Sequence, residues 1–276
     1  MTTTKPAALV TGAGRGLGRG IAELLADRGY LVMVTDLDAD TAAAAATEIG
    51  RGALWAVVDV REHAQVESAR DELIAAAGSL DVWVNNAGVL HTGPAWEQPE
   101  DLRKLQLNVN ALGTINGTVA AIDAMRGRGG HIINIASLAG LSAVSGEAVY
   151  AASKHAVLGF SSSTAADLRL AGVKNIAISC VCPDGIWTPM LYDKLEDPQA
   201  ALSFSGVLLQ PEDVVRAVGK VLDSPKAVTA LPAWRGMIAR LGAAFPRLGV
   251  AALPLLAAQG RRVQKKLHQS QELSRG

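Results

Sequence analysis

Residues 11–25, TGAGRGLGRGIAELL, decide the fold because they join a short apolar run to a helical pattern through a glycine-rich turn. Gly12, Gly16 and Gly18 give the spacing G-x-x-x-G-x-G, which departs from the commoner G-x-G-x-x-G fingerprint. Glycine lets the backbone adopt positive φ and approach a ligand closely, and the first turn of the following helix offers free N–H groups to a phosphate. The stretch therefore predicts a strand, a turn and a helix that together bind the phosphates of a nucleotide.

The same succession of apolar run and helical pattern repeats along the chain. Strands are expected at 7–11, 31–35, 54–58, 81–85, 131–135, 176–181 and 227–231. Helices are expected between them, at 17–28, 39–49, 63–77, 100–125, 149–171 and 211–223. The apolar runs are continuous rather than alternating, as in strands buried on both faces of a parallel sheet. We therefore expect an α/β fold, a doubly wound parallel sheet of Rossmann type with about seven strands and helices on both faces.

The domain organisation follows from composition. No linker, repeat or charged block divides residues 1–232, which we interpret as one Rossmann-type domain with an insert at about 187–210. Residues 233–276 form a basic, amphipathic extension. From Trp234 onward eight Lys or Arg residues stand against one acid, a net charge of +7; because the whole chain has 26 of each sign, the first 233 residues carry −7. The overall neutrality gives no indication of nucleic-acid binding.

Several other classes of protein are disfavoured. Cys180 and Cys182 are spaced i, i+2, which places both on one face of a strand and matches no common zinc or redox motif, so we interpret them as small buried residues. The histidines lack metal-ligand spacing, and no metal is expected. The N-terminus has no signal-peptide pattern, and the run 248–260 is shorter than the about 20 residues that span a bilayer. We expect a cytoplasmic protein.

An acid follows the second expected strand. Asp36 stands 18 residues after Gly18, where a carboxylate can accept hydrogen bonds from the ribose hydroxyls of an adenosine. The same carboxylate repels a 2′-phosphate and so favours NAD over NADP. Arg15 is the opposing signal, since a basic residue in the glycine turn can pair with that phosphate. A direct charge clash outweighs a flexible exposed Arg, so we expect NAD.

Six motifs in order carry a family resemblance: TGAGRGLG, VDV at 58–60, NNAG at 85–88, Asn110 within LNVNALG, Ser137 within NIASLAG, and YAASK at 150–154. Through them the chain resembles the short-chain dehydrogenase/reductase family over residues 6–231. The resemblance implies a nicotinamide cofactor and hydride transfer at a CH–OH group. It also implies roles for individual residues.

The implied cofactor site is spread over the chain. Asp59 and the Val60 backbone hold the adenine edge, and Asn86 lies nearest the ribose. Thr188 reaches the nicotinamide carboxamide or the pyrophosphate. The implied cofactor-binding residues are Gly12, Arg15, Gly16, Leu17, Gly18, Asp36, Asp59, Val60, Asn86, Ala87, Gly88, Tyr150, Lys154, Pro183, Ile186 and Thr188.

The implied catalytic residues are Asn110, Ser137, Tyr150 and Lys154. A free tyrosine has a pKa of about 10 and is a poor base at neutral pH. Lys154, one helical turn from Tyr150, favours the phenolate, and the Ser137 hydroxyl can stabilise charge on the substrate oxygen. The resemblance gives Asn110 a backbone carbonyl that holds a water between Lys154 and solvent.

The expected substrate pocket lies beyond the carboxyl ends of the strands. Its candidate residues are His91, Leu138, Glu147, Asp184, Trp187, Met190 and Tyr192. These are mostly apolar and provide no Arg clamp, so a lipophilic secondary alcohol or ketone (steroid, terpenoid, alicyclic or aryl) is expected. Asp184 departs from the glycine usual in the family, and is interpreted as a turn residue or a substrate contact. The insert suggests a mobile lid or plain loop packing.

Alternatives remain at this point. One alternative is an NADP-dependent 3-oxoacyl-type reductase. Another is that the chain has no catalytic activity and is a nucleotide-binding or membrane-docked interaction protein. Pro246 and Pro254 interrupt the helical spacing of the extension. Its basic, amphipathic pattern fits three placements: over the pocket, at a subunit interface of a homo-oligomer (dimer or tetramer), or in peripheral contact with a membrane.

Overall fold

The computed structural model describes residues 5–275, and its centre is one parallel sheet. The strands run in the order β3-β2-β1-β4-β5-β6-β7. Their bounds are β1 (Ala7–Thr11), β2 (Leu31–Asp36), β3 (Leu54–Val57), β4 (Val82–Asn85), β5 (Gly130–Ile135), β6 (Ile176–Pro183) and β7 (Val228–Leu231). The order reverses between β1 and β4, which opens a crevice at the carboxyl ends of these strands. The predicted doubly wound, seven-stranded parallel sheet is confirmed for the described residues.

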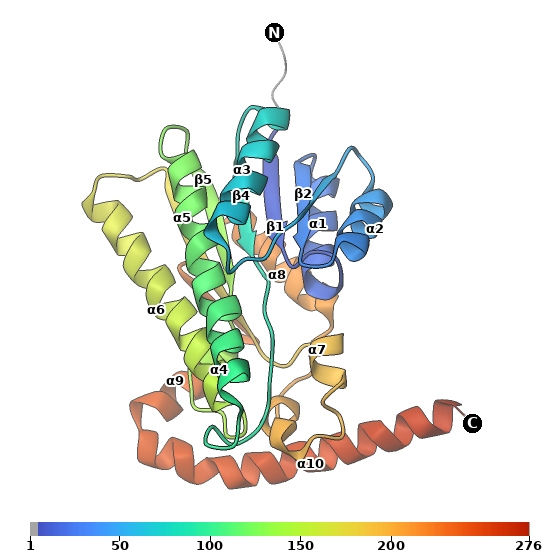
Figure 1. The fold of residues 1–276 in the computed structure, drawn as a ribbon. Helices are drawn as coiled ribbons and strands as arrows, with labels where there is room; N and C mark the ends of the chain where they lie inside the picture. The colour runs from blue at the N-terminus through green and yellow to red at the C-terminus, as the bar shows by residue number, and fades with distance from the viewer. Residues whose placement is uncertain (1–4, 276) are drawn as a thin grey trace.

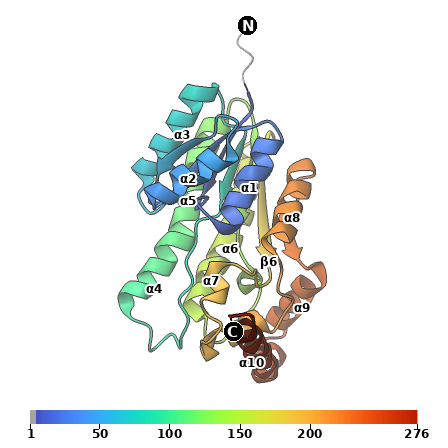
Figure 2. The ribbon, with the colours of Figure 1, turned by 90° about the vertical axis from the view of Figure 1, so that its right-hand side faces the viewer.

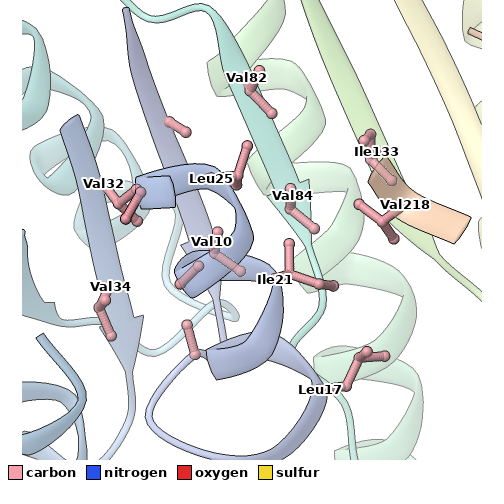
Figure 3. Close-up of a cluster of buried hydrophobic side chains, with 14 of the residues drawn as sticks. Val10, Leu17, Ile21, Leu25, Val32, Val34, Val82, Val84, Ile133 and Val218 are labelled. Atoms are coloured by element: carbon pink, nitrogen blue, oxygen red, sulfur yellow. The ribbon is translucent and has the colours of Figure 1, made fainter. Parts of the chain in front are cut away.

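Helices cover both faces of the sheet (Figure 1). One face packs against α1 (Gly16–Asp27), α2 (Ala39–Ile49) and α8 (Pro211–Asp223). The other packs against α3 (His63–Ala77), α5 (Gly113–Met125) and α6 (Ala148–Leu170). Figure 3 shows the first of these layers, with Ile21 and Leu25 of α1 against Val10 and Val84 of the strands. Leu9 points to the opposite layer, as the period-2 alternation of a strand requires.

The expected helix 100–125 is broken in the middle. It consists of α4 (Glu100–Leu107), a π-helical turn η1 (Asn108–Leu112) and α5. A π-helical turn inside an α-helix commonly marks a functional position, and this one contains Asn110. Gly113 follows it, and a Cβ there would lie 2.5 Å from Cγ2 of Val60. The missing side chain of Gly113 therefore lets the helix pass close to the loop after β3.

The insert between β6 and α8 is folded around its own small core. It contains α7 (Pro189–Tyr192) and the 3-10 helix η3 (Pro198–Phe204). Phe204 is fully buried there, and Val263 of α10 (Pro246–Arg275) packs against the same cluster. Gln264 of α10 donates to the backbone carbonyls of Lys194 and Asp197, at 3.2 and 2.8 Å. The C-terminal helix thus holds the insert in place.

The extension forms two helices, α9 (Ala233–Ala244) and α10. Figures 1 and 2 show α10 crossing beneath the carboxyl ends of the strands. Pro246 separates the two helices, as expected, but α10 continues through Pro254. Pro254 is exposed, so the carbonyl that loses its partner there can be hydrated. Of the helices described between residues 5 and 275, none combines the length and the apolarity needed to span a bilayer.

Cys180 and Cys182 lie side by side on β6. Both are buried, both are free thiols, and their Sγ atoms are 3.9 Å apart. They pack with Ala136 and Val157. The prediction of two small buried residues on one strand face is confirmed.

Candidate active site

A cavity of about 850 Å³ lies at the carboxyl ends of the strands. Its wall is built from the glycine turn, the ends of β2, β4, β5 and β6, the first turns of α6, the insert, and both helices of the extension. The residues predicted to hold the cofactor all lie in this lining: Gly12, Arg15, Gly16, Leu17, Gly18, Asp36, Asp59, Val60, Asn86, Ala87, Gly88, Tyr150, Lys154, Pro183, Ile186 and Thr188.

The glycine turn is tightly packed against the loop after β4. Gly12 and Gly16 have φ of 60° and 57°, a region that favours glycine. A Cβ on Gly18 would lie 2.3 Å from the carbonyl oxygen of Gly12, so any side chain there collides with backbone. The Asn86 amide donates to the carbonyls of Thr11 and Gly12 at 3.0 and 2.9 Å. Asn86 was predicted to lie nearest the ribose, and the structure shows its amide bracing the turn.

Asp36 ends β2 at the wall of the cavity. One carboxylate oxygen accepts the backbone N–H of Gly14 at 3.0 Å, and the other accepts that of Asp38 at 3.3 Å. These bonds hold the carboxylate in one orientation beside the glycine turn. Arg15 is exposed in the same lining and makes no side-chain cap to α1.

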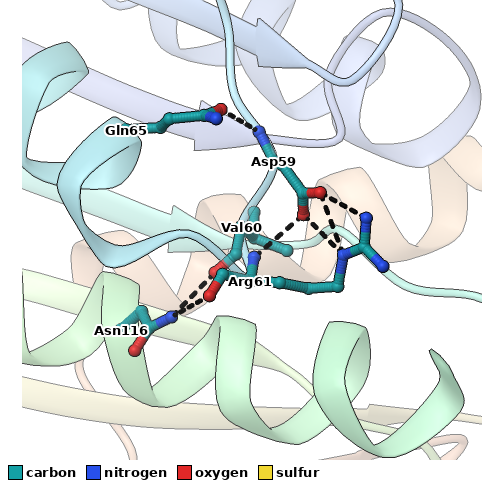
Figure 4. A network of polar contacts seen from close by, with 5 residues as sticks. All are labelled: Asp59, Val60, Arg61, Gln65 and Asn116. Atoms are coloured by element: carbon teal, nitrogen blue, oxygen red, sulfur yellow. Dashed lines mark hydrogen bonds and ion pairs between the residues drawn. The ribbon is translucent and has the colours of Figure 1, made fainter. Parts of the chain in front are cut away.

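The loop after β3 contains a residue that the sequence reasoning missed. Arg61 lines the cavity and forms a bidentate ion pair with Asp59, with Nε at 2.8 and 2.9 Å from the two carboxylate oxygens (Figure 4). Hydrogen bonds from Arg61 hold the pKa of Asp59 below its usual range. Gln65 and Asn116 fix the backbone of this loop. The sequence held a signal for Arg61, because this residue directly follows the VDV motif that was assigned to the cofactor site.

Tyr150 and Lys154 lie one turn apart on α6 and face the cavity together with Ser137. Lys154 is buried, its Nζ donates to the carbonyl of Ile135 at 3.0 Å, and it lies 5.6 Å from the centroid of the Tyr150 ring. Burial lowers the pKa of Lys154 to about 8.

The pKa of Tyr150 departs from the expectation. Burial raises it above the usual value, and the neighbouring Glu147 carboxylate raises it further, while a hydrogen bond with Ser137 acts in the opposite direction. Lys154 is not among the groups that shift the pKa of Tyr150 in the chain by itself, so its predicted effect on the phenolate stays a prediction. Because a buried phenolate loses its hydration, the surroundings of Tyr150 favour the protonated phenol.

Asn110 lies behind the cavity wall. It is completely buried, and its side chain holds Val89 through two hydrogen bonds: Nδ2 to the Val89 carbonyl at 2.9 Å and the Val89 N–H to Oδ1 at 2.8 Å. Its backbone carbonyl, predicted to hold a water, accepts the Thr114 hydroxyl at 2.8 Å. In the structure Asn110 thus positions the loop after β4.

The residues predicted to contact substrate divide into two groups. His91, Leu138, Glu147, Asp184 and Met190 lie in the lining of the cavity. Trp187 and Tyr192 lie outside it and pack against each other, with ring centroids 5.8 Å apart.

Asp184, interpreted from the sequence as a turn residue or a substrate contact, has an ordinary negative φ. Among the described residues Arg51 is the non-glycine with positive φ, so Asp184 needs no such conformation. Its carboxylate instead accepts Arg235 Nε at 2.9 Å and the N–H of Val207 at 3.3 Å.

Glu147 is a buried acid at the front of α6. It is 1% exposed, and Oε1 accepts the Ser203 hydroxyl at 2.6 Å. Burial raises its pKa to about 7, the bond from Ser203 lowers it, and Asp197 raises it. A carboxyl of this kind exchanges its proton near neutral pH.

The extension supplies part of the cavity wall that the sequence did not place. Ile238 of α9 and Gly249, Val250 and Leu253 of α10 belong to the lining. Their helical spacing was visible in the sequence, but it did not say which element they face. In the described part of the chain, no three His, Cys, Asp or Glu side chains gather as a metal site requires.

Comparison with known proteins places this geometry in a family. The model of the short chain dehydrogenase family matches residues 6–199. Carbonyl reductase family member 4 of Xenopus tropicalis is 34% identical over 218 residues, which are 78% of this chain and 90% of the relative. Trans-4-hydroxycyclohexanecarboxylate dehydrogenase of Sinomonas cyclohexanicum is 37% identical over 192 residues, covering 66% of this chain and 73% of the relative.

A solved structure agrees. The crystal structure of a short chain dehydrogenase/reductase from Burkholderia phymatum in complex with NAD has a TM-score of 0.80 and 26% identity, covering 90% of this chain and 97% of that one. With the parallel sheet, the glycine turn and the facing serine, tyrosine and lysine, these matches show that the chain is an oxidoreductase belonging to the short-chain dehydrogenase/reductase family.

Proposed function

We propose that the chain transfers a hydride between NAD and a lipophilic secondary alcohol or its ketone, of steroid, terpenoid, alicyclic or aryl type. One observation carries the proposal: Asp36 and the Ser137, Tyr150 and Lys154 side chains line a single cavity of about 850 Å³. The remaining wall is largely apolar and includes Leu138, Met190 and Leu253. The names of the relatives, a carbonyl reductase and a hydroxycyclohexanecarboxylate dehydrogenase, support chemistry at a carbon–oxygen bond.

The residues present fit a dinucleotide. Gly12, Gly16 and Gly18 line the cavity at the start of α1, and the close packing of Gly18 on the Gly12 carbonyl fixes the turn against which a diphosphate would bind. Asp36 would bind the adenosine ribose and repel a 2′-phosphate, which supports NAD. Lys154 and Thr188 would hold the nicotinamide half. When bound, the nicotinamide ring accepts or donates the hydride, and its oxidised form adds a positive charge that lowers the pKa of Tyr150.

Proton transfer at the substrate oxygen is assigned to Tyr150. In ketone reduction the phenol donates its proton to that oxygen, and its raised pKa keeps it protonated until then. In alcohol oxidation the phenolate accepts the proton. Ser137 hydrogen-bonds the same oxygen, and Lys154 supplies positive charge beside the ring.

Glu147 is proposed as a second polar contact with the substrate. It lines the cavity and is paired with Ser203, so it would accept a hydrogen bond from a hydroxyl distant from the reacting carbon. His91 lies in the same lining, and burial and Lys194 lower its pKa, so it would act as a neutral contact.

A second candidate is an NADP-dependent 3-oxoacyl-type reductase. It is favoured by the cations Arg15 and Arg61 in the lining, and by 32% identity over 219 residues to the 3-oxoacyl-[acyl-carrier-protein] reductase of Chlamydia trachomatis. Arg61 is already neutralised by Asp59, which weakens this argument.

A substrate screen tests the proposal. Lipophilic secondary alcohols and 3-hydroxyacyl thioesters are offered separately with NAD⁺ or NADP⁺, and formation of the reduced cofactor is followed by absorbance. We expect turnover with NAD⁺, and none in a Tyr150→Phe variant. Turnover restricted to NADP⁺ and acyl thioesters would establish the second candidate instead.

A further inference from the structure

The extension presents an apolar surface to solvent. On α9, the side chains of Trp234, Met237, Ile238 and Leu241 recur at i, i+3, i+4 and i+7, and so share one face. Phe245 is exposed at the corner, and Leu248 and Leu255 follow at i, i+7 on one side of α10, while Val250 lies on another side of that helix. Each of these eight side chains is between 53% and 75% exposed. We refer to the exposed apolar side chains of residues 234–255 as the α9–α10 face.

This surface is too concentrated to be incidental. Single exposed apolar side chains are normal on soluble proteins, but contiguous ones mark a site of interaction. The face lies at one end of the molecule, with α9 and α10 beneath the carboxyl ends of the strands (Figures 1 and 2).

Charge indicates which partner covers the face. Residues 234–270 carry seven Lys or Arg and no Asp or Glu. Arg235 is paired with Asp184, whereas Arg240 and Arg247 are exposed beside the face, and further exposed cations follow on α10. If two copies met symmetrically through this face, like charges would be opposed. An anionic lipid surface offers opposite charge to the cations and hydrocarbon to the apolar side chains.

The face is continuous with the cavity. Ile238 and Val250 are more than half exposed and also line the cavity, so they stand at its mouth. The two helices are in contact at Gly242 and Gly249, since a Cβ on Gly249 would lie 2.5 Å from the carbonyl oxygen of Gly242, so the opening does not pass between these two residues. Ile238 and Val250 thus offer an apolar molecule a contact on the face and a contact in the cavity.

We propose that the α9–α10 face docks reversibly on an anionic lipid bilayer and that the substrate enters the cavity from the lipid at Ile238 and Val250. The docking stands on the exposed side chains and cations alone. The route of the substrate rests on the proposed function, since it requires a lipophilic alcohol or ketone.

Vesicle co-sedimentation tests the docking. The full chain is mixed, at low salt, with vesicles of phosphatidylcholine alone or with about 30% phosphatidylglycerol. We expect binding to the anionic vesicles, reduced at least about tenfold in Leu241→Glu/Leu248→Glu and in Arg240→Glu/Arg247→Glu. None of these four residues lines the cavity. Leu170→Glu is the matched control, because Leu170 is 88% exposed at the far end of α6 and should leave binding unchanged.

The remaining outcomes are decisive. Circular dichroism and Tm establish that each variant is folded. Failure of the wild type to bind anionic vesicles overturns the docking, and so does binding of either double variant that equals that of the wild type. If the wild type does not bind vesicles, and light scattering shows that it is a dimer which Leu241→Glu/Leu248→Glu converts to a monomer, the face belongs to an interface with a second copy of the chain.

Tyr150→Phe separates the two proposals, because it should bind vesicles normally while losing turnover. If that variant keeps turnover, the proposed chemistry fails and the docking stands.

Discussion

The carboxylate of Asp184 accepts a hydrogen bond from Arg235 Nε at 2.9 Å and so joins the carboxyl end of β6 to the first turn of α9. Both side chains are largely buried, with 7% and 17% of their surface exposed. Asp184 belongs to the loop after β6, and Arg235 belongs to the extension. The ion pair therefore links the sheet to the extension and fixes the helix that walls the cavity.

Replacing Arg235 should destabilise the fold. Arg235→Met leaves Asp184 as a buried charge without its cation, so we expect the free energy of unfolding to fall by about 3 kcal/mol in urea denaturation. Arg240→Met, at an exposed position of the same helix, should change it by less than about 0.5 kcal/mol. Adding Asp184→Asn to Arg235→Met should restore part of the loss. Equal effects of the two Arg substitutions would show that the ion pair does not hold α9.

Removal of the Tyr150 hydroxyl should abolish chemistry without abolishing binding. Tyr150→Phe keeps the ring on α6 but has no proton to transfer, so kcat should fall by about 10²- to 10⁴-fold. Binding of NADH, followed by fluorescence titration, should change little. Tyr192→Phe is the control, since Tyr192 lies outside the cavity lining and should retain full turnover.

The cofactor preference should depend on Asp36. Asp36→Ala removes the charge that opposes a 2′-phosphate, so the ratio of kcat/KM for NADP⁺ to that for NAD⁺ should rise at least about tenfold, equivalent to about 1.4 kcal/mol. Asp40→Ala, in the exposed first turn of α2, should leave the ratio unchanged. An unchanged ratio in Asp36→Ala would contradict the assignment of NAD.

Glu147 should make stability depend on pH. Its pKa is raised from an ordinary 4.5 to about 7, so between these values the folded chain holds a proton that the unfolded chain has released. The free energy of unfolding therefore falls as pH rises through this window, by about 3 kcal/mol in all, and the loss is complete above pH 7.

The comparison is made by urea unfolding at pH 5 and pH 8. Glu147→Gln should abolish this contribution, so that the variant loses less stability than the wild type between the two values. Glu72→Gln, at an exposed position on α3, should follow the wild type. If the free energy of unfolding of Glu147→Gln fell between pH 5 and pH 8 by as much as that of the wild type, a group other than Glu147 would be responsible for the pH dependence.

The close packing of the glycine turn should be intolerant of a methyl group. Gly18→Ala would bring a Cβ to 2.3 Å from the Gly12 carbonyl oxygen and 2.4 Å from the Asn86 amide nitrogen. The turn must then shift, and we expect NADH binding measured by calorimetry to weaken at least about tenfold. Gly159→Ala is the matched control, because a Cβ there meets nothing within 4 Å and alanine favours the helix.

The sequence by itself determined the sheet, the glycine turn, and the pairing of Tyr150 with Lys154. These features are local: strand runs, turn residues and i, i+4 spacing depend on chain neighbours alone. Arg61, next to the VDV motif, was within reach of the same reasoning. Asn110 was identified from its motif, but its contact with Val89 and the π-helical turn around it depend on how α4 and α5 meet the loop after β4.

Only the tertiary structure decided what surrounds the site. Helical spacing showed that the extension has apolar faces, but not that Ile238 and Leu253 turn to the cavity while Leu241 and Leu248 remain exposed. Trp187 and Tyr192 were expected at the substrate and instead pack against each other. Asp184 forms an ion pair with Arg235, which lies 51 residues further along the chain. Periodicity reports which side of an element is apolar, whereas the element that covers that side is chosen by contacts between distant parts of the chain.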